Sequence, residues 1–190
     1  MPGYKYKNGD RRHHDQHCTA TLVTEDIVLS GWHCLEYYSD LSKDIVFTLP
    51  YAQTDIQRTA RHLVDGGGMH ADWLLLKLSK PISGRVASPV PVSTLSIMEP
   101  GTQALTLAGY SRDSGLGAAG KRLSYDASCE ILQNESYRVA TDCVAFKGSS
   151  GGPVVHGHSI VGVVSAGDSE QLSYYTPSKS FITALRFYLH

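Results

Sequence analysis

The feature that most limits the fold of this chain is the shortness of its apolar runs. Segments rich in Val, Ile, Leu and Thr recur between turn residues, and most are under eight residues long. They cover residues 19–23, 27–30, 45–49, 73–78, 104–108, 154–156 and 160–165. Runs of this length and composition, separated by turn residues, are typical of β-strands in sandwiches and barrels. The pattern therefore predicts an all-β protein.

Composition agrees with one compact globular unit, or two small lobes that share one core, and argues against several other classes of protein. The 190 residues are 42% hydrophobic, which argues against disorder, and 18% charged with 18 glycines, which argues against a coiled coil. The formal net charge of −1 leaves no electrostatic footprint for nucleic acid. No apolar run approaches the roughly 18 residues of a membrane span, so we expect none.

The strand pattern is interrupted in three places. Four prolines break it within residues 80–100, which we predict to be the linker between two lobes: Pro81, Pro89, Pro91 and Pro100. Residues 66–68 are three glycines, and residues 111–120 are rich in glycine and serine; both segments are predicted to be flexible loops.

One helix is predicted, at the C-terminus. Apolar side chains there recur with the spacing of one helix face: Phe181, Ile182, Leu185, Tyr188 and Leu189. Pro177 precedes this segment, and Ser178 is the predicted cap of its first turn. We expect the apolar face to pack against the preceding β-structure.

The chain has four cysteines, and no two of them form a close Cys-x-x-Cys pair: Cys18, Cys34, Cys129 and Cys143. Zinc sites usually draw on such close pairs, so we expect no metal site of this kind. Two local disulfides, Cys18 with Cys34 and Cys129 with Cys143, are the simplest of three pairings. Each would close a loop of about 15 residues, worth about 3 kcal/mol in the chain-entropy model. The alternative is four free buried thiols in a cytosolic protein.

Disulfides persist in oxidising compartments, so they predict a secreted or periplasmic protein. Residues 1–16 are polar and contain no apolar segment of the kind found in signal peptides, so we expect none in this chain. Either a signal was removed or the protein is not exported, and the sequence leaves both open. The cluster of His13, His14, Asp15 and His17 fits the spacing of no standard closed metal site, and we expect a solvated segment without metal.

The strongest chemical signal is the segment KGSSGGP at residues 147–153. Small residues on both sides of Ser150 would let a substrate backbone approach, and glycines permit backbone angles that point successive N–H groups into one pocket. Such a pocket can stabilise the oxyanion of an acyl-transfer reaction. A tight turn between two strands is the other interpretation, because Gly, Ser and Pro are common in turns.

A serine nucleophile needs a base, and the base needs a third group to orient it. His33 follows an apolar run and lies beside Cys34. Asp72 directly precedes another apolar run, where its carboxylate is costly to bury unless an imidazole or another group pairs with it. Taken alone, His33 would be interpreted as an exposed loop residue and Asp72 as an ordinary residue at the edge of a strand. Together with Ser150 they favour a His–Asp–Ser arrangement.

Chain order distinguishes between two hydrolase folds. Residues 148–152 also match the G-x-S-x-G elbow of α/β-hydrolases, in which the Asp and His follow the Ser. Only 40 residues follow Ser150, and they show no alternating strands and helices. The order His33, Asp72, Ser150 matches the chymotrypsin-type arrangement instead.

Taken together, these segments resemble the chymotrypsin/trypsin-like serine peptidases of bacterial type, over residues 17–190. The family's histidine segment is resembled by residues 18–23 and 30–34, its aspartate segment by residues 71–78 and its serine segment by residues 148–153. Residues 165–167 resemble the strand that pairs with the substrate backbone, and residues 174–177 the C-terminal end that leads into a helix.

The resemblance implies a fold of two packed six-stranded antiparallel β-barrels with a C-terminal α-helix. It divides the single peptidase domain into consecutive parts: an N-terminal segment over residues 1–16, a first lobe over 17–85, a second lobe over 95–177 and the helix over 178–190. The catalytic cleft would lie between the two lobes, with His33 and Asp72 from the first and Ser150 from the second.

The resemblance also implies roles for individual residues. Ser150 would attack the scissile carbonyl, His33 would take and return its proton, and Asp72 would orient His33. Backbone N–H groups of Gly148 and Ser150 would form the oxyanion hole. The implied substrate-binding residues are Val144, Ala145, Ser165, Ala166, Gly167 and Ser173. The function implied is a serine endopeptidase, monomeric and without cofactor, acting on a protein or peptide; the alternative is an inactive protein-binding module on the same fold.

One departure from the family concerns how the oxyanion loop is held. Trypsins have an aspartate just before the catalytic serine, and it receives the new N-terminal ammonium after zymogen cleavage. Ser149 stands at this position and carries no charge. We therefore hypothesise that this protein does not use the N-terminal switch, and that the disulfide between Cys129 and Cys143 is a candidate for holding the loop.

Two further departures concern the pocket and the histidine segment. Val144 stands where trypsin has its acidic specificity residue, which predicts a small or apolar residue before the cut. Asp142 and Asp168 lie close enough in sequence to keep a basic preference open. Trp32 replaces a small residue before the histidine, and we expect it in the core.

Overall fold

Every predicted apolar run contains a β-strand. The computed structural model describes residues 2–7, 10–15, 17–36, 45–50, 54–95 and 99–189, with side chains from residue 17 onward. The strands on apolar runs are β3 (Thr21–Leu22), β4 (Ile27–Ser30), β5 (Ile45–Leu49), β7 (Leu74–Leu78), β8 (Leu105–Gly109), β12 (Pro153–His156) and β13 (Ser159–Gly167). The all-β prediction is confirmed.

The remaining strands lack a continuous apolar run. They are β1 (Pro2–Lys7), β2 (Asp10–Asp15), β6 (Ile56–Asp65), β9 (Ser124–Cys129), β10 (Ile131–Asn134), β11 (Val139–Thr141) and β14 (Ser173–Pro177). The first half of β6 alternates between exposed and less exposed side chains, and β9 and β10 expose about half or more of theirs. Strands that bury only one face carry polar residues on the other, so these segments do not have apolar composition.

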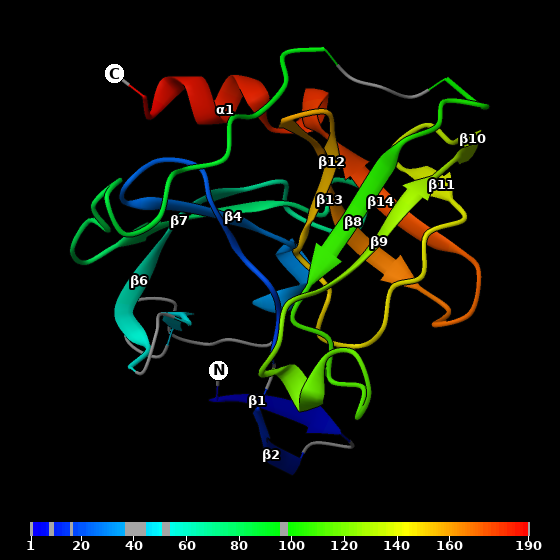
Figure 1. Ribbon diagram of the computed structural model, residues 1–190. Coiled ribbons are helices and arrows are strands. Elements are labelled where there is room, and N and C mark those ends of the chain that lie inside the picture. The colour runs from blue at the N-terminus through cyan, green and yellow to red at the C-terminus, as the bar shows by residue number, and fades with distance from the viewer. Residues whose placement is uncertain are drawn as a thin grey trace.

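The strands form two antiparallel sheets and a separate hairpin of β1 and β2 (Figure 1). The first sheet has five strands in the order β3-β4-β7-β6-β5, and the second has seven in the order β10-β11-β14-β13-β12-β8-β9. Both sheets curl into half-barrels, with five and seven strands where six and six were expected. All strands of the first sheet precede the proline-rich segment and all strands of the second follow it. The lobe boundaries themselves stay a prediction.

The C-terminal helix is present and shorter than predicted. A 3₁₀ turn, η3 (Ser178–Ser180), comes first, and α1 (Ile182–Phe187) follows it. Phe181, not Ser178, precedes the helix, and no side chain caps it, so the predicted cap is wrong. Phe181 and Leu185 are buried, whereas Leu189 is 51% exposed. No helix in the described ranges is long and apolar enough to span a bilayer.

The proline-rich segment is bonded to both sheets. The Val90 N–H donates to the Leu22 carbonyl oxygen at 2.9 Å, which ties the segment to the first sheet. Ile160 of the second sheet donates to the Pro91 carbonyl oxygen and accepts from the Ser93 N–H, each at 2.8 Å. These bonds fix the described part of the connection, and residues 96–98 lie outside it.

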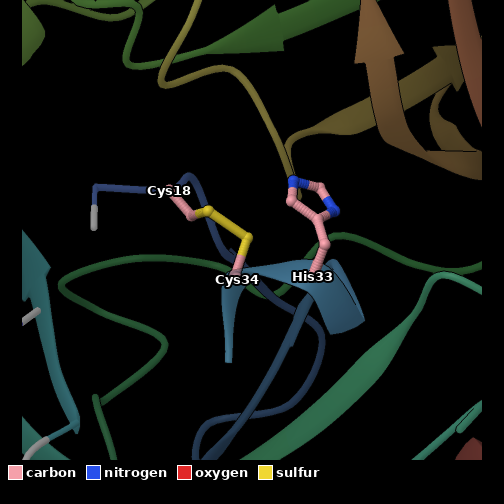
Figure 2. Close-up of side chains that lie close together, drawn as sticks. All are labelled: Cys18, His33 and Cys34. Carbon is pink, nitrogen blue, oxygen red and sulfur yellow. A yellow bond between two sulfur atoms is a disulfide. The ribbon is translucent and has the colours of Figure 1, made fainter. Parts of the chain in front are cut away.

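Both predicted disulfides are present, so the interpretation as free thiols is wrong. The Cα atoms of Cys18 and Cys34 lie 6.2 Å apart, and those of Cys129 and Cys143 5.2 Å apart. Figure 2 shows the first bridge beside His33, on the same short turn, η1 (Trp32–Cys34). This bridge ties the turn that carries His33 to the segment that precedes β3.

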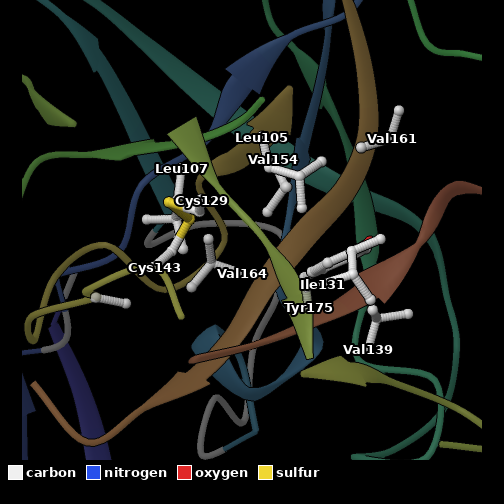
Figure 3. Packing of buried hydrophobic residues seen from close by; sticks show 11 residues of the cluster. Leu105, Leu107, Cys129, Ile131, Val139, Cys143, Val154, Val161, Val164 and Tyr175 are labelled. Carbon is white, nitrogen blue, oxygen red and sulfur yellow. A yellow bond between two sulfur atoms is a disulfide. The ribbon is translucent and has the colours of Figure 1, made fainter. Parts of the chain in front are cut away.

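Three clusters of buried side chains form the core. One lies within the second sheet and includes Leu105, Ile131, Val154, Val164 and Tyr175 (Figure 3). Another lies within the first sheet and includes Val28, Ile45, Leu74, Leu76 and Leu78. The third, called here the joining cluster, contains residues of both sheets and of the C-terminal helix: Ile27, Leu29, Trp73, Leu75, Ile160, Val163, Phe181 and Leu185.

Alternation along β4 and β7 explains why most residues of these strands are apolar. Successive side chains of a strand point to opposite faces, so Leu74 and Leu76 enter the core of the first sheet while Leu75 enters the joining cluster. On β4, Val28 enters the first core while its two neighbours enter the joining cluster. Both faces of these strands are therefore buried, which favours apolar residues, and only Ser30 of β4 and Lys77 of β7 are polar.

We predict that Leu75→Ala destabilises the protein by about 2–5 kcal/mol, because Leu75 is fully buried where the sheets meet and alanine would leave a cavity. Denaturant unfolding followed by circular dichroism measures the change. Leu95→Ala is the matched control, because Leu95 is 75% exposed, and it should change stability by less than about 0.5 kcal/mol. Equal effects of the two substitutions would contradict the assignment of the joining cluster.

Candidate active site

His33 and Asp72 are brought together by the pairing of β4 with β7. The two strands are antiparallel neighbours, with Ser30 at the end of β4 opposite Leu74 at the start of β7. His33 lies three residues after Ser30 and Asp72 two residues before Leu74. Because the end of one strand lies beside the beginning of the other, the two side chains meet at the same edge of the sheet.

The Asp72 carboxylate is fully buried and accepts three hydrogen bonds. Its Oδ2 atom lies 2.8 Å from Nδ1 of the His33 ring, and its Oδ1 atom accepts from the His33 backbone N–H at 3.0 Å. The Ser165 hydroxyl donates to Oδ2. The pairing that the sequence required for a buried carboxylate is therefore present. A ring that donates from Nδ1 to Asp72 keeps Nε2 as its acceptor.

Ser165 comes from β13 of the second sheet, so its bond to Asp72 joins the two sheets at the site. The sequence predicted Ser165 as a residue of the substrate-binding strand, together with Ala166 and Gly167. That prediction concerns the backbone of the strand and stays a prediction. The Ser165 hydroxyl is directed at Asp72, and no local sequence pattern indicated this contact, because the two residues are 93 positions apart.

Ser150 lies in the turn that precedes β12, packed against the end of β4. The Ser150 carbonyl oxygen accepts from the Thr19 N–H at 2.8 Å. Gly151 has a φ of +78°, and a β-carbon there would lie 2.2 Å from the Ser30 hydroxyl oxygen, so only glycine permits this approach. The serine segment of the second sheet thus contacts the strand that leads to His33.

The predicted pocket segment is held by side chains from other strands. The Asp126 carboxylate on β9 accepts from the Val144 N–H at 2.8 Å, and the Ser173 hydroxyl donates to the Cys143 carbonyl oxygen at 2.6 Å. The predicted walls also lie close together, because a β-carbon on Gly167 would lie 2.8 Å from that of Ala145. The substrate-binding role of Ser173 stays a prediction, and Asp126, which is separated from Val144 by 18 positions, was not predicted for this segment.

Asp142 and Asp168, the two carboxylates that kept a basic preference open, both bind backbone amides. Asp168 accepts from the N–H groups of Glu170, Gln171 and Leu172, and these bonds, that of Glu170 first, lower the pKa of its carboxyl. Asp142 accepts from the Glu130 N–H at 2.6 Å. These contacts give no support to a basic preference.

Trp32 differs from its predicted place. Its side chain is only partly buried, and it belongs to none of the three clusters of buried residues. The tryptophan that does enter the core is Trp73, whose ring centroid lies 6.2 Å from that of Phe181. The expectation that Trp32 is a core residue is therefore wrong.

Potential metal ligands gather at two places in the described residues. One group is Cys18, His33 and Cys34, and the other is Asp126, Cys129 and Cys143. In each group the two sulfur atoms form a disulfide, so neither offers the thiolate that binds a metal. Each group is left with one ligand, which does not fit a closed metal site.

The loop over residues 111–120 is ordered around Asp113. Its carboxylate accepts from the Ser111 hydroxyl at 2.5 Å and from the N–H groups of Gly115 at 2.9 Å and Gly117 at 3.0 Å. The bond from Ser111 first, and then those from the backbone, lower the pKa of the carboxyl. The loop is adjacent to the serine segment, because the Arg112 N–H donates to the Lys147 carbonyl oxygen at 2.7 Å.

We predict that this loop loses order in acid. A carboxyl whose pKa is lower in the folded than in the unfolded state stabilises the fold above the unfolded value, about 3.9, and this contribution disappears as pH falls through the folded value. The amide proton shifts of Gly115 and Gly117, followed by NMR, should titrate together below that value. Asp113→Ala should abolish their titration and leave the amides that bind Asp168 unchanged. Titration that persists in Asp113→Ala would contradict the assignment.

The chain matches a family model and is similar to solved structures. A family model described as Trypsin matches residues 4–185. The structure is similar to that of kallikrein-related peptidase 10, with a TM-score of 0.69 and 20% sequence identity over 99% of this chain and 94% of that one. At this identity the structural match establishes the fold alone, which is chymotrypsin-like. No curated protein matches by sequence.

Proposed function

The chain belongs to the trypsin family, whose model covers residues 4–185, and on this basis we propose that it is a serine endopeptidase. The proposed nucleophile is Ser150, the base is His33, and Asp72 orients the base. The observation that carries the proposal is the fully buried Asp72 carboxylate, which binds both the ring and the backbone N–H of His33. A carboxylate in this position stabilises the imidazolium that forms during acyl transfer.

The proposed reaction has two steps. In the first, Ser150 Oγ bonds to the scissile carbonyl carbon while its proton passes to Nε2 of His33. The tetrahedral oxyanion accepts from the N–H groups of Gly148 and Ser150; the carbon–nitrogen bond then breaks, and His33 gives the proton to the leaving amine. In the second step water attacks the ester, again through His33, which releases the acid and restores Ser150. Water is the only co-reactant.

We predict that Ser150→Ala lowers peptide hydrolysis on the order of 10⁴- to 10⁶-fold, because no other group supplies the attacking oxygen. Turnover of a fluorogenic peptide measures the change, and thermal unfolding checks that the fold is retained. Ser159→Ala, the same change at the start of β13, is the control and should keep wild-type turnover. Turnover by Ser150→Ala equal to that of the wild type would contradict the proposal.

The proposed preference is for a small or apolar residue before the cut. Val144 gives the pocket segment no charge, and the close approach of Gly167 to Ala145 leaves little width between the proposed walls. A long basic or acidic side chain would find neither space nor a partner there. Burying such a charge without a partner is costly.

This preference predicts the outcome of a peptide library that varies only the residue before the cut. Peptides with Ala or Val should be cleaved with kcat/KM at least about tenfold above those with Lys, Arg or Glu. Preferred cleavage after Lys or Arg would mean that a carboxylate reaches the pocket, and would contradict the proposed specificity but not the proposed reaction.

We also propose that the protein works in an oxidising compartment, secreted or periplasmic. Both cysteine pairs form disulfides, and one of them adjoins the proposed base. In the cytosol, cysteine pairs of this kind are usually kept reduced as free thiols.

A further inference from the structure

We propose that the Thr19 hydroxyl is the positioning group that holds the proposed oxyanion hole in its working orientation, in place of an N-terminal ammonium. The proposal rests on the proposed function, because the orientation of Gly148 matters only if Ser150 attacks a carbonyl. Thr19 does not touch the substrate in this account; it acts through the backbone of Gly148.

All polar groups of Thr19 are used, and its partners come from three distant segments. The residue is 3% exposed. Its hydroxyl donates to the Gly148 carbonyl oxygen and accepts from the Tyr110 N–H, each at 2.8 Å. Its backbone N–H donates to the Ser150 carbonyl oxygen at 2.8 Å, and its carbonyl oxygen accepts from the Ser30 hydroxyl at 2.8 Å. One buried residue therefore links the ends of β4 and β8 to the serine segment, through its side chain to Tyr110 and Gly148 and through its backbone to Ser30 and Ser150.

These contacts fix the peptide groups on both sides of Gly148. The preceding group is held through the Lys147 carbonyl oxygen, which accepts from the Arg112 N–H at 2.7 Å, and the following group is held by Thr19. In a trans peptide the C=O and N–H bonds point in opposite directions, and the described residues contain no cis peptide. The Lys147 carbonyl directed at Arg112 thus turns the Gly148 N–H to the opposite side, away from the loop.

The space around Gly148 fits this arrangement and excludes a side chain. Gly148 has a φ of +101°, in the region that favours glycine. A β-carbon there would lie 2.6 Å from the Tyr110 carbonyl oxygen. Tyr110 therefore bounds Gly148 with its carbonyl while its N–H binds Thr19. Rotation of the Gly148–Ser149 peptide would leave the buried Thr19 hydroxyl without its acceptor, which opposes the rotation.

Ser149 explains why such a group is needed. It is 3% exposed and has no carboxylate, so it cannot form an ion pair with an N-terminal ammonium. The disulfide between Cys129 and Cys143, the candidate from the sequence, ends five residues before Gly148. The contacts at Gly148 itself come from Thr19 and the loop of Arg112. Thr19 also follows Cys18, which is bridged to the residue after His33, so the same segment adjoins the proposed base.

The test compares three variants by steady-state kinetics on the fluorogenic peptide. Thr19→Val removes the hydroxyl and keeps the branched shape of the side chain. It should lower kcat about 10- to 100-fold with little change in KM. This loss is smaller than the roughly 10²–10³-fold loss of kcat on removing an oxyanion donor itself, because Thr19 acts through Gly148. Thr19→Ser keeps the hydroxyl and should restore kcat. Thr141→Val is the matched control, because the buried Thr141 hydroxyl likewise donates to a carbonyl, that of Glu130, and accepts from an N–H, that of Cys143. It should lose stability but not kcat.

A second measurement separates positioning from general destabilisation. A peptide aldehyde forms a bond from its carbonyl carbon to Ser150 Oγ and so creates the oxyanion, whereas a product peptide does not. Thr19→Val should weaken aldehyde binding by the same factor as kcat/KM and leave binding of the product peptide unchanged. If the valine variant does not fold, Thr19→Ala replaces it in both measurements.

The outcomes that overturn the proposal are distinct. Wild-type kcat and aldehyde affinity in Thr19→Val would show that the hydroxyl does not position the loop, and so would an equal loss of kcat in Thr141→Val or no recovery in Thr19→Ser. If the wild-type protein does not cleave peptides and has the same turnover as Ser150→Ala, the proposed function is refuted and this proposal with it. An active wild type with an unaffected Thr19→Val variant refutes this proposal alone.

Discussion

The site depends on one buried charge. Asp72 has no exposed surface, and an isolated carboxylate in such a place would be strongly destabilising. Its three donors are the His33 ring, the His33 backbone and the Ser165 hydroxyl, and the last of these comes from the other sheet. Satisfying this carboxylate therefore requires that the first sheet close correctly and that the second sheet pack against it. The same hydrogen bonds also orient His33, because its ring and its backbone N–H both bind the Asp72 carboxylate.

Three sets of contacts pack the second sheet against the first, as the buried Asp72 carboxylate requires. The joining cluster buries apolar side chains of both sheets and of the C-terminal helix. Closer to the site, the absence of a side chain at Gly151 lets the serine segment reach Ser30. At the site itself, Thr19 of the first sheet's N-terminal segment binds the backbone on both sides of Ser149. Apolar burial holds the two sheets together, and hydrogen bonds from side chains and backbone groups fix the segments of the site against one another.

Much of this could be read from the sequence, for identifiable reasons. Strands buried on both faces, such as β4 and β7, are mostly apolar and were predicted. Strands β6, β9 and β10, which expose one face or an edge, were not. The association of His33 with Asp72 followed from the cost of burying a carboxylate. Contacts of Ser165, Asp126 and Thr19 join residues distant in the chain, and nothing in their neighbours indicates a partner. Trp32 was misassigned because residue type alone does not say which of the chain's two tryptophans, Trp32 or Trp73, enters the core.

The most direct test of the account is covalent labelling of the folded protein by a peptidyl diphenyl phosphonate, located by mass spectrometry. A serine is phosphonylated by this reagent only when a base activates it and an oxyanion site receives the phosphoryl oxygen. The account predicts one adduct, on Ser150, and its loss in His33→Ala under the same conditions. The absence of an adduct on Ser150 in folded wild-type protein, or equal labelling of the His33→Ala variant, would contradict it.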